Sequence, residues 1–85
     1  MIMEKPAHPP VVVRLERTGR GGKTVTCVEG VRAPPEGLAA LLKTLKTRLG
    51  AGGVLEKGAL VIQGDQRERL CALLPTLGYP AKRGN

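Results

Sequence analysis

The 85-residue sequence contains no phenylalanine and no tryptophan, and Tyr79 is its single aromatic residue. Modules that read single-stranded nucleic acid stack the bases on aromatic side chains, so this chain lacks a stacking platform for that kind of recognition. Its core must instead be built from leucine, valine and isoleucine. With 41% apolar residues, the chain still has enough such side chains to fold as one small globular domain.

Residues that carry catalysis or bind metals are also scarce. His8, the only histidine, lies in a proline-rich segment, which argues against a general base or a metal ligand. Cys27 and Cys71 do not have the spacing of a zinc site, and we expect two reduced, buried thiols rather than a disulfide. The acidic residues are scattered, without a carboxylate pair. The sequence therefore predicts a protein that is not an enzyme and that needs neither cofactor nor metal.

Long hydrophobic runs are missing. The longest uninterrupted apolar runs fall far short of the ~20 residues that span a membrane and of a secretory signal. We therefore expect a cytoplasmic protein without a membrane partner.

Positive charge, in contrast, is abundant, with a formal net charge of +7. The excess gathers over residues 14–23, over residues 43–48, and at Lys82 and Arg83. A basic excess on so small a domain favours a polyanionic partner such as nucleic acid. The alternative is a solvated cationic surface that only aids solubility.

The N-terminal half of the chain predicts a basic β-hairpin. Residues 1–10 carry three prolines and predict a flexible arm ahead of a domain over residues 11–85. Alternation predicts a strand over residues 11–17, with Val11, Val13 and Leu15 on one face. The β-branched residues 24–31 predict a second strand, whose inward phase is ambiguous near Val28, as at a bulge. The glycine-rich segment between these strands forms the turn.

Two leucine stripes predict amphipathic helices. The first helix starts at Pro34-Pro35 and ends at Gly50. The second follows Asp65, which we expect to cap it together with Glu68 in a capping box. Pro75 should kink this helix or end it at the preceding residue. The stripes are Leu38, Leu41, Leu42, Leu45 and Leu49 in the first helix, and Leu70, Leu73, Leu74 and Leu77 in the second.

Three short strands complete the pattern. They cover residues 52–55, residues 59–63 and residues 79–83, the last at a sheet edge where Pro80 is tolerable. The element order is β-β-α-β-β-α-β. This order predicts an α+β fold in which both helices cover one face of a mixed five-stranded sheet.

Two glycine-rich segments do not meet the requirements of nucleotide-binding motifs. A phosphate-binding loop ending at Lys23-Thr24 would need glycine where Arg17 stands, and a helix after the loop. The segment Gly50–Gly53 has Leu55 at the last glycine position of a dinucleotide fingerprint and follows a helix rather than a strand. A nucleotide-hydrolysing enzyme is therefore disfavoured.

The basic hairpin is the best candidate for a functional site. Cations on a glycine-rich turn can enter a groove and follow phosphates, and arginine can bind a phosphate through two hydrogen bonds. Without stacking aromatics, recognition of a folded RNA by shape and backbone fits better than reading of a free strand. The alternative is an exposed turn kept soluble by its charge. The hairpin cations are Arg14, Arg17, Arg20 and Lys23.

Three segments of the chain resemble the eukaryotic-type translation initiation factor one family, which includes bacterial and archaeal stand-alone members. Residues 62–67, Ile-Gln-Gly-Asp-Gln-Arg, resemble the family signature. Residues 19–26, followed by 28–31, resemble its basic hairpin. Residues 46–53 resemble the end of its first helix and the glycine turn that follows. The likeness runs from about Arg14 to Arg83, and three motifs in the right order are more specific than one.

The resemblance implies a protein that binds the RNA of the small ribosomal subunit beside the initiator tRNA site and favours correct start-codon pairing. It implies initiator tRNA and other initiation factors as further partners, and we expect a monomer. Arg17, Arg20 and Lys23 match the loop cations of the family, and Lys43 and Lys46 on the first helix are implied as further RNA contacts. The alternative is a general RNA-binding or RNA-chaperone module without a dedicated ribosomal site.

Overall fold

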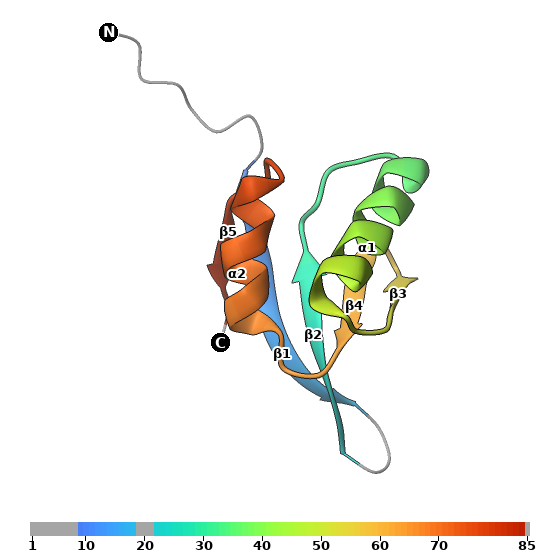
Figure 1. Cartoon of the computed structure of the whole chain (residues 1–85), viewed down its shortest axis with the longest axis vertical. Helices are drawn as coiled ribbons and strands as arrows, with labels where there is room; N and C mark the ends of the chain where they lie inside the picture. Colours follow the sequence, from blue (N-terminus) through green and yellow to red (C-terminus); the bar gives the residue numbers. More distant parts are fainter. Residues whose placement is uncertain (1–8, 19–21, 85) are drawn as a thin grey trace, which may run out of the picture.

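A computed structural model describes residues 9–18 and 22–84 and shows a sheet with two helices on one of its faces (Figure 1). The strand order is β3-β4-β2-β1-β5, with β5 parallel to β1 and the other neighbours antiparallel. This confirms the predicted element order and the mixed five-stranded sheet. The predicted flexible arm lies mostly outside the described residues. The elements are β1 (Val11–Thr18), β2 (Lys23–Glu29), α1 (Pro35–Leu49), β3 (Gly53–Glu56), β4 (Ala59–Gln63), α2 (Arg67–Thr76) and β5 (Ala81–Arg83).

Aliphatic side chains fill the space between the sheet and the helices. The strands supply side chains that are 0% exposed, and the helices supply buried leucines from both predicted stripes. Burial of such a side chain stabilises the fold by roughly 1.5–3 kcal/mol relative to exposure, so these residues hold the two layers together. The cluster consists of Val11, Val13, Val28, Leu60 and Ile62 from the strands, and Leu41, Leu45, Leu49, Leu70 and Leu74 from the helices.

The ends of α1 confirm the sequence prediction. Pro35 occupies the first turn, where its missing N–H would have no helical partner. Gly50 adopts the left-handed conformation with φ 63°, and its N–H donates to the carbonyl of Lys46. Glycine reaches this conformation without the steric cost that a Cβ imposes, so it ends the helix cleanly.

The remaining strands are close to their predicted ranges. β4 matches residues 59–63, and Lys57 and Gly58 form the preceding turn with φ of 50° and 79°. Positive φ at both positions matches the twist of a tight hairpin. β5 is shorter than predicted because Pro80 precedes it, and the carbonyl of Pro80 accepts a hydrogen bond of 2.8 Å from the N–H of Val11.

β2 is regular where a bulge was predicted. Its register with β1 runs without interruption from Val12↔Glu29 to Thr18↔Lys23. The ambiguous phase near Val28 has another cause, which is burial on both faces of a central strand. Thr26 and Val28 lie under the helices, whereas Val25 and Cys27 are buried on the opposite, open face of the sheet.

The two cysteines are free thiols on different layers of the fold. Cys27 is buried on β2, and burial raises the pKa of its thiol. Cys71 lies on α2 and is only half-buried, so the prediction that both thiols are buried is wrong for Cys71.

The start of α2 differs from the prediction. The helix begins at Arg67, and Gln66 occupies the N-cap position without a side-chain cap hydrogen bond. Asp65 lies one residue further out, so the predicted capping box with Glu68 is wrong. The Asp65 carboxylate instead accepts hydrogen bonds from the N–H of Arg67 at 3.3 Å and from the Arg67 guanidinium at 2.9 Å.

The end of α2 decides against one of the two alternatives predicted for Pro75. Pro75 does not end the helix at Leu74, because the helix continues to Thr76. Proline removes one hydrogen bond in the last turn. The N–H groups of Leu77 and Tyr79 both donate to the carbonyl of Leu74, at 2.9 and 3.0 Å, and close the helix end.

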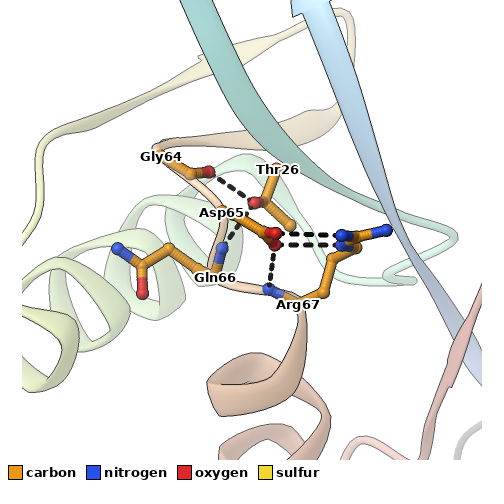
Figure 2. A network of polar contacts seen from close by, with 5 residues as sticks. All are labelled: Thr26, Gly64, Asp65, Gln66 and Arg67. Atoms are coloured by element: carbon orange, nitrogen blue, oxygen red, sulfur yellow. Dashed lines mark hydrogen bonds and ion pairs between the residues drawn. The ribbon is translucent and has the colours of Figure 1, made fainter.

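A buried threonine joins β2 to the turn before α2 (Figure 2). The Thr26 hydroxyl donates to the carbonyl of Gly64 at 2.7 Å and accepts from the N–H of Gln66 at 2.8 Å. The N–H of Gly64 donates to the carbonyl of Thr24 at 2.9 Å. Gly64 has φ 85°, a backbone conformation that favours glycine. The family-like segment 62–67 is therefore hydrogen-bonded to the β1–β2 hairpin. The Thr26 side chain, rather than a side-chain cap on Gln66, binds the backbone before α2.

Replacing Thr26 with valine should destabilise the protein. The change keeps the shape of the side chain but leaves the part-buried carbonyl of Gly64 and N–H of Gln66 without this partner, which costs about 1–3 kcal/mol. Urea denaturation would measure the free energy of unfolding. Thr76→Val is the control, because the Thr76 hydroxyl bonds the carbonyl of Leu73 at an exposed position. Equal destabilisation of the two variants would contradict the role given to Thr26.

The ion pair between Asp65 and Arg67 should make stability depend on pH. The Arg67 guanidinium lowers the pKa of the Asp65 carboxyl from its ordinary value of 3.8. A lowered folded-state pKa stabilises the protein above the ordinary value, and this contribution is lost as pH falls through the folded-state pKa. Asp65→Asn should therefore have a lower melting temperature than the parent near neutral pH, with the gap closing in acid. A gap that stays constant on acidification would contradict this effect.

Candidate RNA-binding surface

The β1–β2 hairpin extends beyond the rest of the sheet. β4 pairs with β2 only from Val25 to Val28, and β5 pairs with β1 only from Val11 to Val13. Among the strands of the described residues, none lies as a third strand beside the outer pairs Arg17↔Thr24 and Thr18↔Lys23. Figure 1 shows this end of the hairpin projecting past both helices. We name residues 17–24 the finger.

The finger carries exposed positive charge. Arg17 and Lys23 are both exposed, and neither takes part in the ion pairs between residues of the described ranges. Because side chains alternate along a strand, Arg17 lies on the face that bears the helices and Lys23 on the open face. A finger with cations on both faces can contact phosphates on two sides of a groove. Arg20 lies outside the described residues.

The second half of α1 adds cations at the same end of the molecule. Lys43 and Lys46 are exposed on the side of the helix away from the leucine stripe. Residues three apart are neighbours on a helix surface, so the two ammonium groups form one patch. The C-terminal end of α1 points toward the end of the sheet from which the finger projects (Figure 1). Lys46 lies in the last turn, where the helix dipole favours a cation.

Arg14 is set apart from the other predicted contacts. It lies on the open face of the sheet, where its guanidinium donates to Glu16 at 2.7 Å and to Glu29 at 2.9 Å. These two carboxylates raise the pKa of Arg14, and Arg14 in turn lowers the pKa of Glu29. With two ion-pair partners, Arg14 is much less available to a phosphate than Arg17 or Lys23.

Sequence reasoning missed Gln63, beside the finger, and Arg48, at the end of α1. Lys23, Thr24, Val25 and Gln63 line a hollow of about 250 Å³ at the base of the finger. Gln63 is exposed, and its side chain lies against Gly52, where an added Cβ would come 3.2 Å from Gln63 Oε1. Two signals pointed to Gln63, the end of a predicted strand and the family-like segment 62–67, but neither indicated a place beside the finger. Arg48, exposed in the last turn of α1, is a further cation omitted from the predicted set.

The surface offers charge and shape rather than aromatic stacking. Tyr79, the single aromatic residue of the sequence, is partly buried against the core. Across residues 9–18 and 22–84, no three His, Cys, Asp or Glu side chains are grouped so that they could hold a metal ion. Neither helix of these ranges has the length and the hydrophobicity of a membrane-spanning segment.

Comparison with known proteins identifies the family. The family model described as translation initiation factor SUI1 matches residues 7–80. The uncharacterized protein sll0546 of Synechocystis sp. is 47% identical over 77 residues, which cover 91% of this chain and 69% of that protein. The protein translation factor SUI1 homolog of Aeropyrum pernix is 40% identical over 70 residues, with 82% and 68% covered. The uncharacterized protein YciH of Salmonella typhimurium is 34% identical over 88 residues, with 94% and 82% covered. These matches confirm the resemblance noted from the sequence, and the chain belongs to the SUI1 family of translation initiation factors.

Proposed function

We propose that this protein binds the small ribosomal subunit near the initiator tRNA site and promotes accurate start-codon selection. The observation that carries the proposal is the cationic finger. It projects past the core, presents Arg17 and Lys23 on its two faces, and leaves both side chains outside the ion pairs of the described residues. Such a finger suits the narrow, phosphate-lined spaces of a folded RNA.

The affinity comes mainly from phosphate contacts. Each cation that neutralises a phosphate releases a condensed counterion, so binding is strong at low salt and weakens as salt rises. Lys43 and Lys46 on α1 supply a second group of contacts beside the finger. Two groups held on one rigid frame fix the orientation of the protein, whereas a single flexible basic tail would not.

Start-codon selection follows from competition. When the finger and a correctly paired initiator tRNA need the same space, each weakens the binding of the other by the same factor. Correct pairing then displaces the factor, whereas incorrect pairing releases less free energy and leaves the factor in place. In this account the protein acts as a cytoplasmic monomer through binding alone, without a cofactor. Initiator tRNA and other initiation factors contact it on the subunit.

The finger is tested by paired charge reversals. Arg17→Glu with Lys23→Glu should weaken binding to isolated small subunits at least about tenfold. The salt dependence should become shallower by about one unit of slope for each phosphate that the protein no longer neutralises. The control, Lys57→Glu with Lys82→Glu, makes the same change in net charge at exposed positions outside the finger. Equilibrium binding over a salt series measures both quantities.

We expect binding to weaken more in the finger variant than in the control, with both variants unfolding at the temperature of the parent. Equal weakening in the two variants would mean that only net charge matters. The finger would then not be the contact, and a general RNA-binding module without a ribosomal site would be the better account.

A further inference from the structure

The open face of the sheet has a hollow where the finger leaves the core. Among the described residues, Lys23, Thr24, Val25 and Gln63 line this hollow of about 250 Å³. Val25 and Gln63 are cross-strand partners, and Val25 is only 9% exposed, so its side chain forms an apolar bottom. Lys23 and Gln63 are exposed and lie at the rim. An apolar bottom with a few polar groups around it is the usual arrangement of a site that binds a small organic group.

The side-chain amide of Gln63 is available to a ligand. With the other described residues, this amide makes no hydrogen bond. It lies against Gly52, where an added Cβ would come 3.2 Å from Gln63 Oε1 and 3.5 Å from Gln63 Nε2, so the absence of a side chain on Gly52 makes room for it. A glutamine amide has one accepting oxygen and one donating nitrogen. Gln63 can therefore form two parallel hydrogen bonds with a ligand edge that carries an acceptor beside a donor.

The charge at this hollow favours an anionic ligand. Among the described residues that line it, Lys23 alone is charged. The carboxylate nearest along the sheet is that of Glu16, the cross-strand partner of Val25. Arg14 donates to that carboxylate at 2.7 Å, which offsets its negative charge. A phosphate beside Lys23 is therefore attracted by the ammonium group and meets a neutralised neighbour.

We infer that the hollow binds one unpaired nucleotide of the RNA, and that Gln63 binds the edge of its nucleobase. Adenine is the nucleobase that suits this amide, because glutamine forms two hydrogen bonds with its N6 amino group and N7. Val25 contacts the face of the ring, and Lys23 binds the phosphate of the same nucleotide. Unpaired nucleobases in RNA loops and bulges expose their edges to such contacts. The inference rests on the proposed function for RNA as the ligand, and adds a nucleobase contact to a surface that otherwise binds phosphates.

NMR titration of the isotope-labelled full-length chain with adenosine 5′-monophosphate tests the inference. One control ligand is ribose 5-phosphate, which lacks the nucleobase, and the other is the monophosphate of unsubstituted purine riboside, which lacks only the amino group. We expect saturable shifts of the Gln63 side-chain amide with the adenine nucleotide, at a dissociation constant on the order of 5 mM. Binding of the purine nucleotide should be about fivefold weaker, since one hydrogen bond is lost. Ribose 5-phosphate should not shift this amide.

Two matched variants test the role of Gln63, with the backbone amides of Lys23 and Val25 as the signals. Gln63→Leu removes the amide, so the adenine and purine nucleotides should bind equally. Gln66→Leu removes the amide that bonds the carbonyl of Gln63 at 3.3 Å from outside the hollow, and should keep the preference for adenine. The amide spectrum of each variant shows whether it is folded.

Equal shifts with ribose 5-phosphate would overturn the inference, because only the phosphate would then be bound. A preference for adenine that survives Gln63→Leu would also overturn it, as would the absence of saturable shifts around the hollow with the adenine nucleotide. These outcomes leave the proposed function standing, since binding to isolated small subunits and its loss on charge reversal in the finger test that function separately.

Discussion

The buried hydroxyl of Thr26 is the contact on which the geometry of the proposed RNA-binding surface depends. It joins the central strand β2 to the turn before α2, and the N–H of Gly64 is bonded to Thr24 at the finger's base. Beyond this point, within the part of the chain that the structure describes, the β1–β2 ladder is the backbone pairing that holds the finger. The polar groups of Thr26, Gly64 and Gln66 at this base are satisfied within the protein (Figure 2), and a fully satisfied network makes the base of the finger rigid. The family-like segment 62–67 therefore serves the finger as a structural support.

The sheet separates two kinds of surface. On one side, α1 presents lysines to solvent, and the finger extends past the helices with cations on both of its faces. On the other side, an apolar floor is edged by carboxylates, and Arg14 is paired with Glu16 and Glu29. Alternation along β1 and β2 produces this separation, since successive side chains point to opposite faces. The same alternation places Arg17 and Lys23 on opposite faces of the finger.

Much of this fold could be predicted because its signals are local. Pro34, Pro35 and Gly50 mark the two ends of α1, and a leucine stripe marks its buried face. These signals and the alternation of β1 each depend on residues close together in the sequence. The errors arose where a distant contact replaced a local one. Thr26, 38 residues from Gly64, binds the turn before α2, so the expected capping box did not form. β2 is buried on both faces, so its sequence lacks the apolar–polar alternation of a half-buried strand and was interpreted as a bulge. Arg14 stays a predicted RNA contact, and the strand register adds what the sequence does not show, namely that Glu29 lies near it.

We propose that one site on the small ribosomal subunit binds the positive charges of the projecting finger, which a rigid base holds in place. Equilibrium binding of the protein to isolated small and large subunits at ~0.15 M salt tests this most directly, since exposed charges more than ~8 Å apart are then largely screened. The account predicts saturable, one-to-one binding to the small subunit alone. Weak binding of equal strength to both subunits would contradict it, because only general affinity for polyanions would then remain.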